Sequence, residues 1–243
     1  MKTETRNRKR MYDDHTGSSY EVARYGDPYK EQYRQMRNEA LTGLIRENLG
    51  DDKSLRILEV GCGTGMTLTY LASLPAGHEL HGMDFSQTML SQAHQKLAGV
   101  DNPYRLALGD SFELPYGENV FDVIYSTRFM HQFNHDDKKR IYAEMLRVLK
   151  QGGLVVNEFY SRHSKWSLFL RGLKEYPTAS QCPSQSEVGD IVGGPYARRP
   201  VRVVGMRAIN NLLGVQALQY VTSLAGKPVF NMFLEEYFVA SKK

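Results

Sequence analysis

The sequence predicts an α/β fold in which helices pack on both faces of a doubly wound, mostly parallel sheet. Two observations favour this class. Short apolar runs alternate with amphipathic stretches over most of the chain, as repeated strand–helix units do. In one such unit, residues 57–72, an apolar run is joined to a helix-like run by a loop with glycine at every second position. Glycine-rich loops between strand and helix build nucleotide pockets in such sheets.

The remaining elements are expected in chain order. Helical spacing of apolar residues predicts a helix over 31–49, which Gly50 ends. A second helix is expected between a cap at Ser86 and a stop at Gly99. The other predicted helices span residues 64–74, 136–149 and 203–213, and the predicted strands span residues 53–60, 79–84, 104–108, 121–126, 154–159, 215–221 and 233–240.

Two segments fall outside this alternation. Residues 161–176 are amphipathic, and residues 177–200, rich in Ser, Gly, Pro and Gln, read as a loop. We therefore expect an N-terminal helical cap or arm over 1–50 and a main domain over 51–243, with an insertion at 161–200. A long loop in a compact domain is often a lid or a binding loop.

Composition limits the classes of function. The 243 residues include 41% hydrophobic residues, and no apolar run is long enough to span a membrane. The N-terminus is charged without an apolar core behind it, so it is not a secretory signal. Two cysteines make neither a disulfide framework nor a zinc site, so no metal is expected and a cytoplasmic location fits best. A net charge of +4 permits an anionic substrate without demanding nucleic acid.

The glycine loop narrows the choice of ligand. A dinucleotide fingerprint needs a third glycine where the chain has Met66, so that pattern fails. The loop instead reads Glu59-x-Gly61-x-Gly63-x-Gly65. A carboxylate just before the loop suits a ligand with a cationic amino group better than a pyrophosphate.

This loop, Glu59-Val60-Gly61-Cys62-Gly63-Thr64-Gly65, resembles the first motif of class I S-adenosylmethionine-dependent methyltransferases. Residues 84–86 (Asp-Phe-Ser) resemble the second motif of the family. Residues 113–126 and 147–153 are similar to segments of the ubiquinone and menaquinone biosynthesis enzymes. The resemblance implies S-adenosylmethionine as cofactor and a Rossmann-like, seven-stranded sheet that ends in an antiparallel hairpin.

Several residues are candidates for cofactor binding. Asp84 lies 19 residues beyond Gly65, where an acid in a doubly wound fold accepts hydrogen bonds from ribose hydroxyls. The family resemblance implies that Asp110 accepts from the adenine amino group and that Phe112 forms an apolar wall. An ordinary loop carboxylate is the other reading of both acids. The full expected set is Glu59, Gly61, Cys62, Gly63, Thr64, Gly65, Asp84, Phe85, Met89, Gly109, Asp110, Ser111, Phe112 and Ser126.

Candidates for the catalytic site are fewer, because methyl transfer from a sulfonium needs alignment and exclusion of water more than acid–base groups. His131, just past the fourth strand, is the first candidate for a general base. Glu158 late in the fifth strand and Tyr25 in the N-terminal segment are the others. Gln132 stands where the resembling family has a second histidine, so a two-histidine arrangement is in doubt. A purely structural role remains open for His131, and surface packing for Tyr25.

The leading function is methylation of a small molecule whose acceptor atom and oligomeric context the sequence does not specify. Methylation of RNA or protein is an alternative, because the N-terminus is basic and Arg198, Arg199, Arg202 and Arg207 cluster near the end of the insertion. These arginines suit a phosphate or carboxylate on the substrate, or simply form a solvated basic face. A non-catalytic binding module is a third reading and a nicotinamide oxidoreductase a distant fourth.

Overall fold

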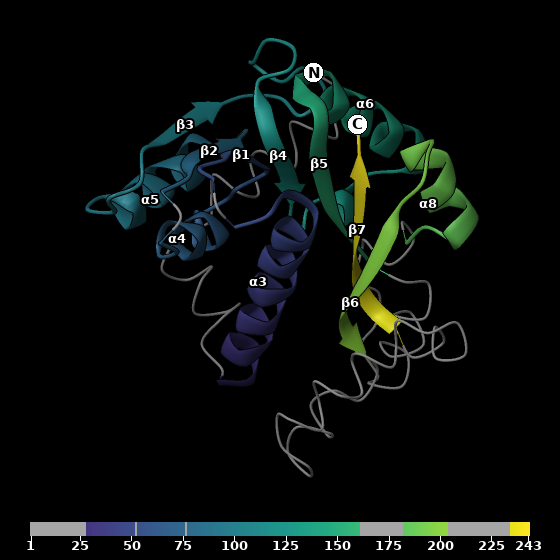
Figure 1. Ribbon diagram of the computed structural model, residues 1–243, viewed down its shortest axis with the longest axis horizontal. Helices are drawn as coiled ribbons and strands as arrows, with labels where there is room; N and C mark the ends of the chain where they lie inside the picture. The colour runs from purple at the N-terminus through teal and green to yellow at the C-terminus, as the bar shows by residue number, and fades with distance from the viewer. Residues whose placement is uncertain (1–27, 52, 76, 161–181, 204–233) are drawn as a thin grey trace.

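The computed structural model describes residues 28–243 except 52, 76, 161–181 and 204–233. Its centre is a seven-stranded sheet in the order β3-β2-β1-β4-β5-β7-β6 (Figure 1). The strands are β1 (Arg56–Val60), β2 (Glu79–Asp84), β3 (Tyr104–Leu108), β4 (Phe121–Ser126), β5 (Leu149–Tyr160), β6 (Ala197–Val203) and β7 (Leu234–Lys242). The helices are α3 (Pro28–Leu49), α4 (Met66–Ala72), α5 (Gln87–Leu97), α6 (His135–Val148) and α8 (Gln185–Val192), with a 3₁₀ turn η1 (Met130–Gln132). The doubly wound α/β class is confirmed.

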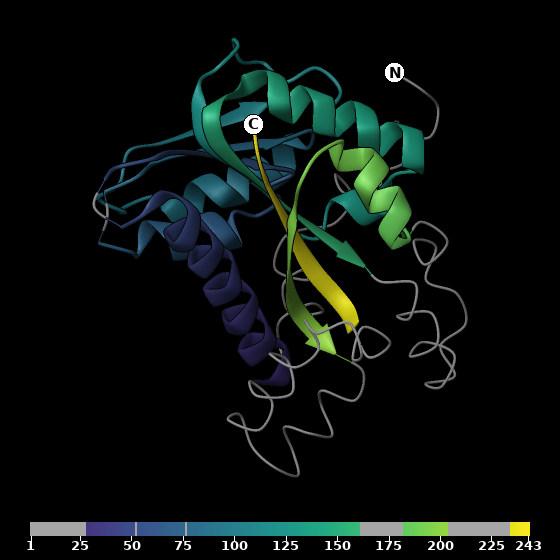
Figure 2. The ribbon, with the colours of Figure 1, turned by 45° about the vertical axis from the view of Figure 1, so that its right-hand side comes forward.

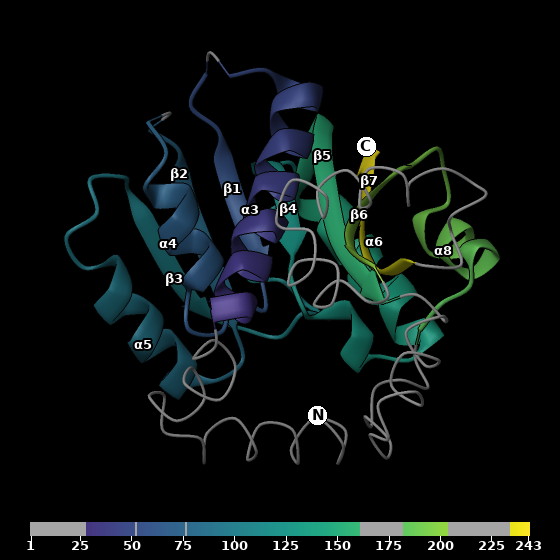
Figure 3. The ribbon, with the colours of Figure 1, turned by 90° about the horizontal axis from the view of Figure 1, so that it is seen from below.

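The strand directions decide where a ligand site lies. Strands β1 to β5 are parallel to one another, and β7 is antiparallel to both β5 and β6. Helices α3, α4 and α5 cover one face of the sheet, and α6 and α8 cover the other (Figures 2 and 3). The chain order reverses between β1 and β4, which makes the carboxyl ends of these strands the switch point where such sheets bind ligands.

Most predicted elements of the first 150 residues are found with small shifts at their ends. The structure has β2, β3 and β4 at the predicted bounds. The predicted cap of α5 is present, since the Ser86 side chain accepts a hydrogen bond from the Met89 amide. Helix α6 begins at His135, one residue before the predicted start, and Asn134 caps it by accepting from the Asp137 amide.

Helix α3 lies against the second half of the sheet. Its apolar residues Leu41, Leu44 and Ile45 are buried. The helix contacts β5 and β6, and Arg199 on β6 pairs with Glu47 on the helix. Among the described residues, no helix combines the length and apolarity that crossing a bilayer requires.

The loop expected over 177–200 is wrong, because this stretch contains α8 and most of β6. Helix α8 begins with a capping box in which Ser184 accepts from the Glu187 amide and Glu187 accepts from the Ser184 amide. Strand β6, rich in arginine, is stabilised by pairing with β7. The antiparallel pair at the end of the sheet is therefore made by Ala197–Val203, and the strand predicted at 215–221 lies outside the described residues.

Strand β5 is longer than predicted. It begins at Leu149, where the preceding helix was expected to end, rather than at Leu154. A register shift in the β4–β5 pairing between Phe121 and Val123 accommodates the extra residues. The chain end holds them in place, since the Gly152 amide donates to the Lys243 carbonyl and the Lys243 amide donates to the Gly153 carbonyl.

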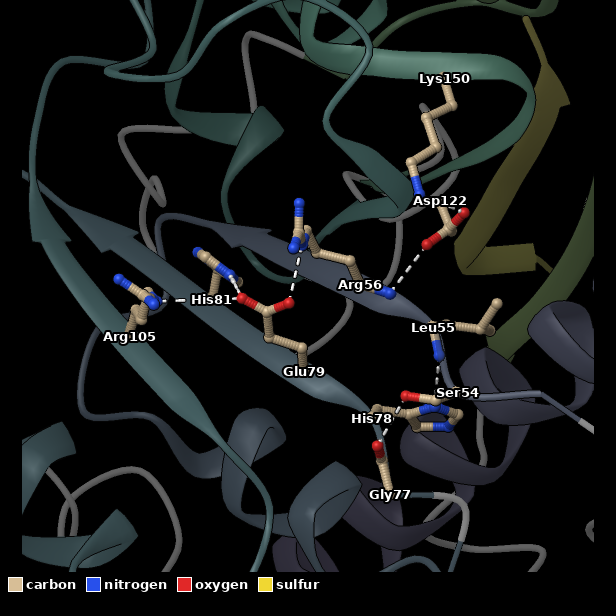
Figure 4. A network of polar contacts seen from close by, with 10 residues as sticks. All are labelled: Ser54, Leu55, Arg56, Gly77, His78, Glu79, His81, Arg105, Asp122 and Lys150. Carbon is tan, nitrogen blue, oxygen red and sulfur yellow. Dashed lines mark hydrogen bonds and ion pairs between the residues drawn. The ribbon is translucent and has the colours of Figure 1, made fainter.

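The amino-terminal edge of the sheet carries a separate polar network (Figure 4). The Glu79 carboxylate contacts Arg56 at 2.7 Å and His81 at 2.9 Å. The Asp122 carboxylate accepts from the Arg56 amide and from the Lys150 ammonium, both at 2.9 Å. These groups join the first residues of neighbouring strands at the edge opposite the glycine loop, so they serve to hold strands together.

Candidate functional site

Backbone hydrogen bonds hold the glycine loop, residues 61–65, against the neighbouring strand β2. The amides of Gly61 and Cys62 both donate to the Met83 carbonyl, at 2.8 and 3.0 Å. The Gly65 amide donates to the Cys62 carbonyl at 2.9 Å, which closes the turn into α4. The loop is therefore rigidly placed at the carboxyl edge of β1 and β2.

The three loop glycines have positive φ angles, which L side chains rarely adopt. A Cβ on Gly61 would lie 2.3 Å from the Phe129 ring, and one on Gly65 would lie 2.9 Å from the Ala93 side chain. A Cβ on Gly63 would meet no atom within 4 Å. Gly61 and Gly65 thus allow close packing within the protein, whereas Gly63 faces open space that a ligand can use.

Asp84 is bonded directly to this loop. One carboxylate oxygen accepts from the Gly63 amide at 2.8 Å, and the other accepts from the Ser86 amide at 3.0 Å. The side chain is nearly buried. Since each carboxylate oxygen can accept more than one hydrogen bond, the same group can hold the loop and accept from ligand hydroxyls.

Glu59 lies at the end of β1 and is also buried. Its two oxygens accept hydrogen bonds from the Tyr125 and Thr127 hydroxyls, both at 3.0 Å. Burial raises the pKa of Glu59 to about 8, against the opposing effect of these hydroxyls. A cationic ligand group nearby would favour the ionised form of this carboxylate.

The end of β3 lies next to the loop. The Gly109 amide donates to the Asp84 carbonyl at 3.0 Å, so Gly109 and Asp84 are adjacent. Asp110 is exposed, and its carboxylate accepts from the Phe112 amide at 3.0 Å. The Phe112 ring is half-buried between Phe133 and the guanidinium of Arg140, which lies 4.7 Å from the ring centre.

The other expected cofactor residues lie at or next to this edge. Thr64, Phe85 and Ser111 lie in its loops, and Thr64 and Ser111 are buried. Cys62 and Met89 are buried, and burial raises the pKa of the Cys62 thiol well above its usual value, so the thiol is protonated at neutral pH.

Ser126 differs from the other expected cofactor residues in the direction of its side chain. Its hydroxyl donates to the Asn157 amide oxygen at 2.6 Å in the interior of the sheet. Asn157 in turn donates to the Met145 sulfur on α6, so this pair faces α6. Any contact of Ser126 with a cofactor is therefore a backbone contact.

Two of the three expected catalytic residues lie at the carboxyl end of β5. His131, in η1, is buried with its ring 4.7 Å from the Tyr160 ring. Glu158 is fully buried, and one of its oxygens accepts from the Arg128 amide at 2.6 Å. The third, Tyr25, lies outside the described residues.

Sequence reasoning missed the residues that surround Glu158. Tyr33 and Arg37 on α3 and Glu236 on β7 are all buried. The Tyr33 hydroxyl donates to Glu236 and lies 3.3 Å from Glu158. The available signal was a Tyr and an Arg four residues apart within the helical stripe of residues 31–49, which places them on one face.

Two of the four arginines that the sequence groups between residues 198 and 207 make contacts within the protein. Arg199 pairs with Glu47, and the Arg198 guanidinium lies 5.9 Å from the Tyr237 ring centre. The side chain of Arg202 and all of Arg207 lie outside what the structure describes. Two of the four arginines thus contribute to packing around β6.

Comparisons with known proteins agree with this geometry. Residues 57–153 match the family model of a methyltransferase domain. A demethylmenaquinone methyltransferase of Staphylococcus aureus is 37% identical over 113 residues, which are 46% of each chain. The chain thus matches about half the length of this curated relative. Residues 57–153 are therefore similar to methyltransferase domains.

Solved structures extend the likeness of the methyltransferase domain to the whole sheet. The magnesium protoporphyrin IX methyltransferase of Synechocystis, solved with bound S-adenosylhomocysteine, is 14% identical with a TM-score of 0.64 over 99% of both chains. A [4+2]-cyclase is 18% identical with a TM-score of 0.56, over 84% of this chain and 79% of that one. At such identities the likeness concerns the fold, and this fold carries more than one kind of reaction.

Proposed function

We propose that the protein transfers a methyl group from S-adenosylmethionine to a small-molecule acceptor. The observation that carries the proposal is the glycine loop at the carboxyl edge of β1. Its middle glycine, Gly63, faces open space while its amide is held by Asp84. The residues present therefore fit this cofactor.

Each end of the cofactor has a proposed partner. Asp84 would accept from the ribose hydroxyls, as acids do at the end of the second strand in doubly wound folds. Glu59 and the loop amides would hold the methionine end, where the carboxylate suits an ammonium group. Asp110 and Phe112 would bind the adenine, the first as an acceptor and the second as an apolar wall. Bound S-adenosylmethionine supplies a methyl carbon that its sulfonium charge already activates.

The acceptor would bind next to the end of β4. Residues 127–133 follow that strand and contain His131, and the neighbouring strand β5 contributes Glu158. The protein must align the acceptor atom with the methyl carbon and exclude water, and it needs a base only for an acceptor that arrives protonated. Either His131 or Glu158 would take that proton.

The observations restrict the chemical class of the methyl acceptor less than they restrict the identity of the cofactor. The matched family model, residues 57–153, does not reach Glu158, β6 or β7. Since the relative in Staphylococcus aureus is named for demethylmenaquinone, a reduced demethylmenaquinone is the first acceptor to test. An anionic acceptor remains a prediction, as do the cap over 1–50 and a cytoplasmic location.

The test follows a methyl label. Purified protein, methyl-labelled S-adenosylmethionine and a cell extract are incubated, and small-molecule, RNA and protein fractions are counted. We expect label in small molecules, and much less of it with the Asp84→Ala variant. Label in RNA or protein would contradict the acceptor class. An absence of both label and S-adenosylhomocysteine binding by calorimetry would contradict the whole proposal.

A further inference from the structure

Three acidic residues lie in a buried row along the carboxyl edge of the sheet. They are Glu59 on β1, Glu158 on β5 and Glu236 on β7, each no more than 2% exposed. The sheet register places the last two together. Tyr160 pairs with Glu236 across the β5–β7 ladder, and Glu158 lies two residues before Tyr160 on the same face.

One hydroxyl group on helix α3, that of Tyr33, lies next to both Glu158 and Glu236. The Tyr33 hydroxyl donates a hydrogen bond to one oxygen of Glu236 and lies 3.3 Å from one oxygen of Glu158. A tyrosine hydroxyl has one hydrogen, so it donates to one of the two carboxyl groups only. The contact with the other is favourable when that carboxyl group is protonated and donates to the tyrosine oxygen.

The surrounding charges indicate which carboxyl group holds the proton. Burial and the neighbouring Glu236 raise the pKa of Glu158, while the guanidinium groups of Arg37 and Arg128 oppose this shift. Burial also raises the pKa of Tyr33 well above its usual value, so its hydroxyl stays neutral. The consistent arrangement is a Glu158 hydroxyl that donates to Tyr33 and a Tyr33 hydroxyl that donates to Glu236.

The row connects to the proposed methyl-transfer site through the segment after β4. Thr127 donates to Glu59, and the next residue, Arg128, donates its amide to Glu158. Arg128 has a φ of 52°, a conformation that costs energy for a residue other than glycine and that clusters at functional sites. Glu158 thus lies between the segment that follows β4 and the hydrogen-bonded pair of Tyr33 and Glu236.

We propose that Glu158, Tyr33 and Glu236 form a proton relay that takes up the proton released by the methyl acceptor. This inference rests on the proposed function and adds Tyr33 and Glu236 to it. As an electron pair of the acceptor atom forms its bond to the methyl carbon, the carbon–sulfur bond breaks and its electron pair stays on sulfur. The acceptor proton passes to Glu158, the Glu158 proton passes to Tyr33, and the Tyr33 proton passes to Glu236.

The relay leaves every group except Glu236 in its starting charge state. Glu158 ends protonated on its other oxygen, Tyr33 remains a neutral phenol, and Glu236 becomes a neutral acid. Glu158 is the group that meets the acceptor, whereas Tyr33 and Glu236 act through it as positioning residues. Helix α3 would therefore belong to the reaction site as well as to the fold.

The first test is infrared spectroscopy of the full chain, which detects the C=O stretch of protonated carboxyl groups. At pH 7 we expect such a band, with one component lost in Glu158→Gln and a different one lost in Glu59→Gln. Tyr33→Phe should shift the Glu158 component, because it removes the hydroxyl that this group contacts. Tyr142→Phe is the matched control, since it removes another buried hydroxyl, bonded to Ser241 on β7, and should leave the Glu158 component unchanged.

The second measurement separates a relay from a structural cluster. With the acceptor found by methyl labelling, Tyr33→Phe and Glu236→Gln should lower kcat about 100-fold or more at pH 7. Their affinity for S-adenosylhomocysteine should be unchanged, and kcat should recover as the pH is raised.

The two proposals fail in different ways. Intact binding of S-adenosylhomocysteine without a carboxyl band that depends on Glu158 would overturn the relay alone. An absence of S-adenosylhomocysteine binding in the wild-type protein would overturn the proposed function. A Tyr33→Phe variant with wild-type kcat and pH profile would also overturn the relay.

Discussion

The two halves of the sheet hold their proposed ligands by different means. Around β1, β2 and β3 the site is made mainly of backbone, with loop amides that donate to Met83 and to Asp84. Around β5 and β7 the site is made of buried side chains, namely Glu158, Tyr33 and Glu236. A backbone site suits a cofactor that does not vary, and a side-chain site can change with the acceptor. Substitutions should therefore separate cofactor binding from turnover.

The largest expected effect concerns turnover. Glu158→Gln should lower kcat about 100-fold to 10,000-fold, the range for loss of a general base, without changing affinity for S-adenosylhomocysteine. His131→Gln, at the other candidate base, should lower kcat less than about tenfold, since its ring packs on Tyr160. Initial rates and calorimetry measure the two quantities. A larger loss in His131→Gln would reassign the base.

The next effect concerns affinity for the cofactor. Asp84→Ala removes the acceptor of the Gly63 and Ser86 amides as well as the proposed ribose contact. We expect a loss of about 100-fold in S-adenosylhomocysteine affinity by calorimetry, near the upper end of the range for one lost hydrogen bond to a charged group. Asp122→Ala is the matched control, because that carboxylate lies in the network at the opposite edge (Figure 4). Equal losses in both variants would mean that Asp84 acts only through stability.

Two glycine substitutions distinguish packing within the loop from contact with the ligand. Gly61→Ala should lower the free energy of unfolding by about 2–4 kcal/mol, because its Cβ meets the Phe129 ring and its φ is positive. Gly63→Ala should cost about 1–2 kcal/mol, from the positive φ alone. Urea unfolding without ligand gives both values. Titration with S-adenosylhomocysteine should then show a loss of binding in Gly63→Ala despite its smaller destabilisation.

The remaining effect is a pH dependence from Glu59. The pKa of this group is about 8 in the folded protein, against 4.5 as its ordinary value. The unfolded chain therefore loses this proton at lower pH than the folded protein does. Between pH 4.5 and 8 the free energy of unfolding should fall by up to about 1.4 kcal/mol per pH unit from this group.

Urea unfolding at several pH values checks this slope. Glu59→Gln carries no titrating group there, so the variant should gain stability relative to wild type as the pH rises from 5 to 8. A difference between the two proteins that stays constant over this range would show that Glu59 is ionised when folded.

The amino-acid sequence by itself determined the part of the sheet from β1 to β4, where the cofactor is proposed to bind. The bounds of β2, β3 and β4, the cap of α5 and the register of Asp84 to the glycine loop follow from local signals. Strand runs, caps and glycine spacing act over a few residues, so they can be read without knowing the rest of the fold.

Only the tertiary structure decided how β5, β6 and β7 pair and which buried side chains meet beside them. Residues 197–200 belong to the predicted loop, yet they form the first part of β6 because β7 offers a strand to pair with. Tyr33 and Glu236 are 203 residues apart in sequence and meet only because α3 packs against β5 and β6, the two neighbours of β7 in the sheet. Strand pairing and buried charge depend on partners distant in the chain, and no local pattern specifies such a partner.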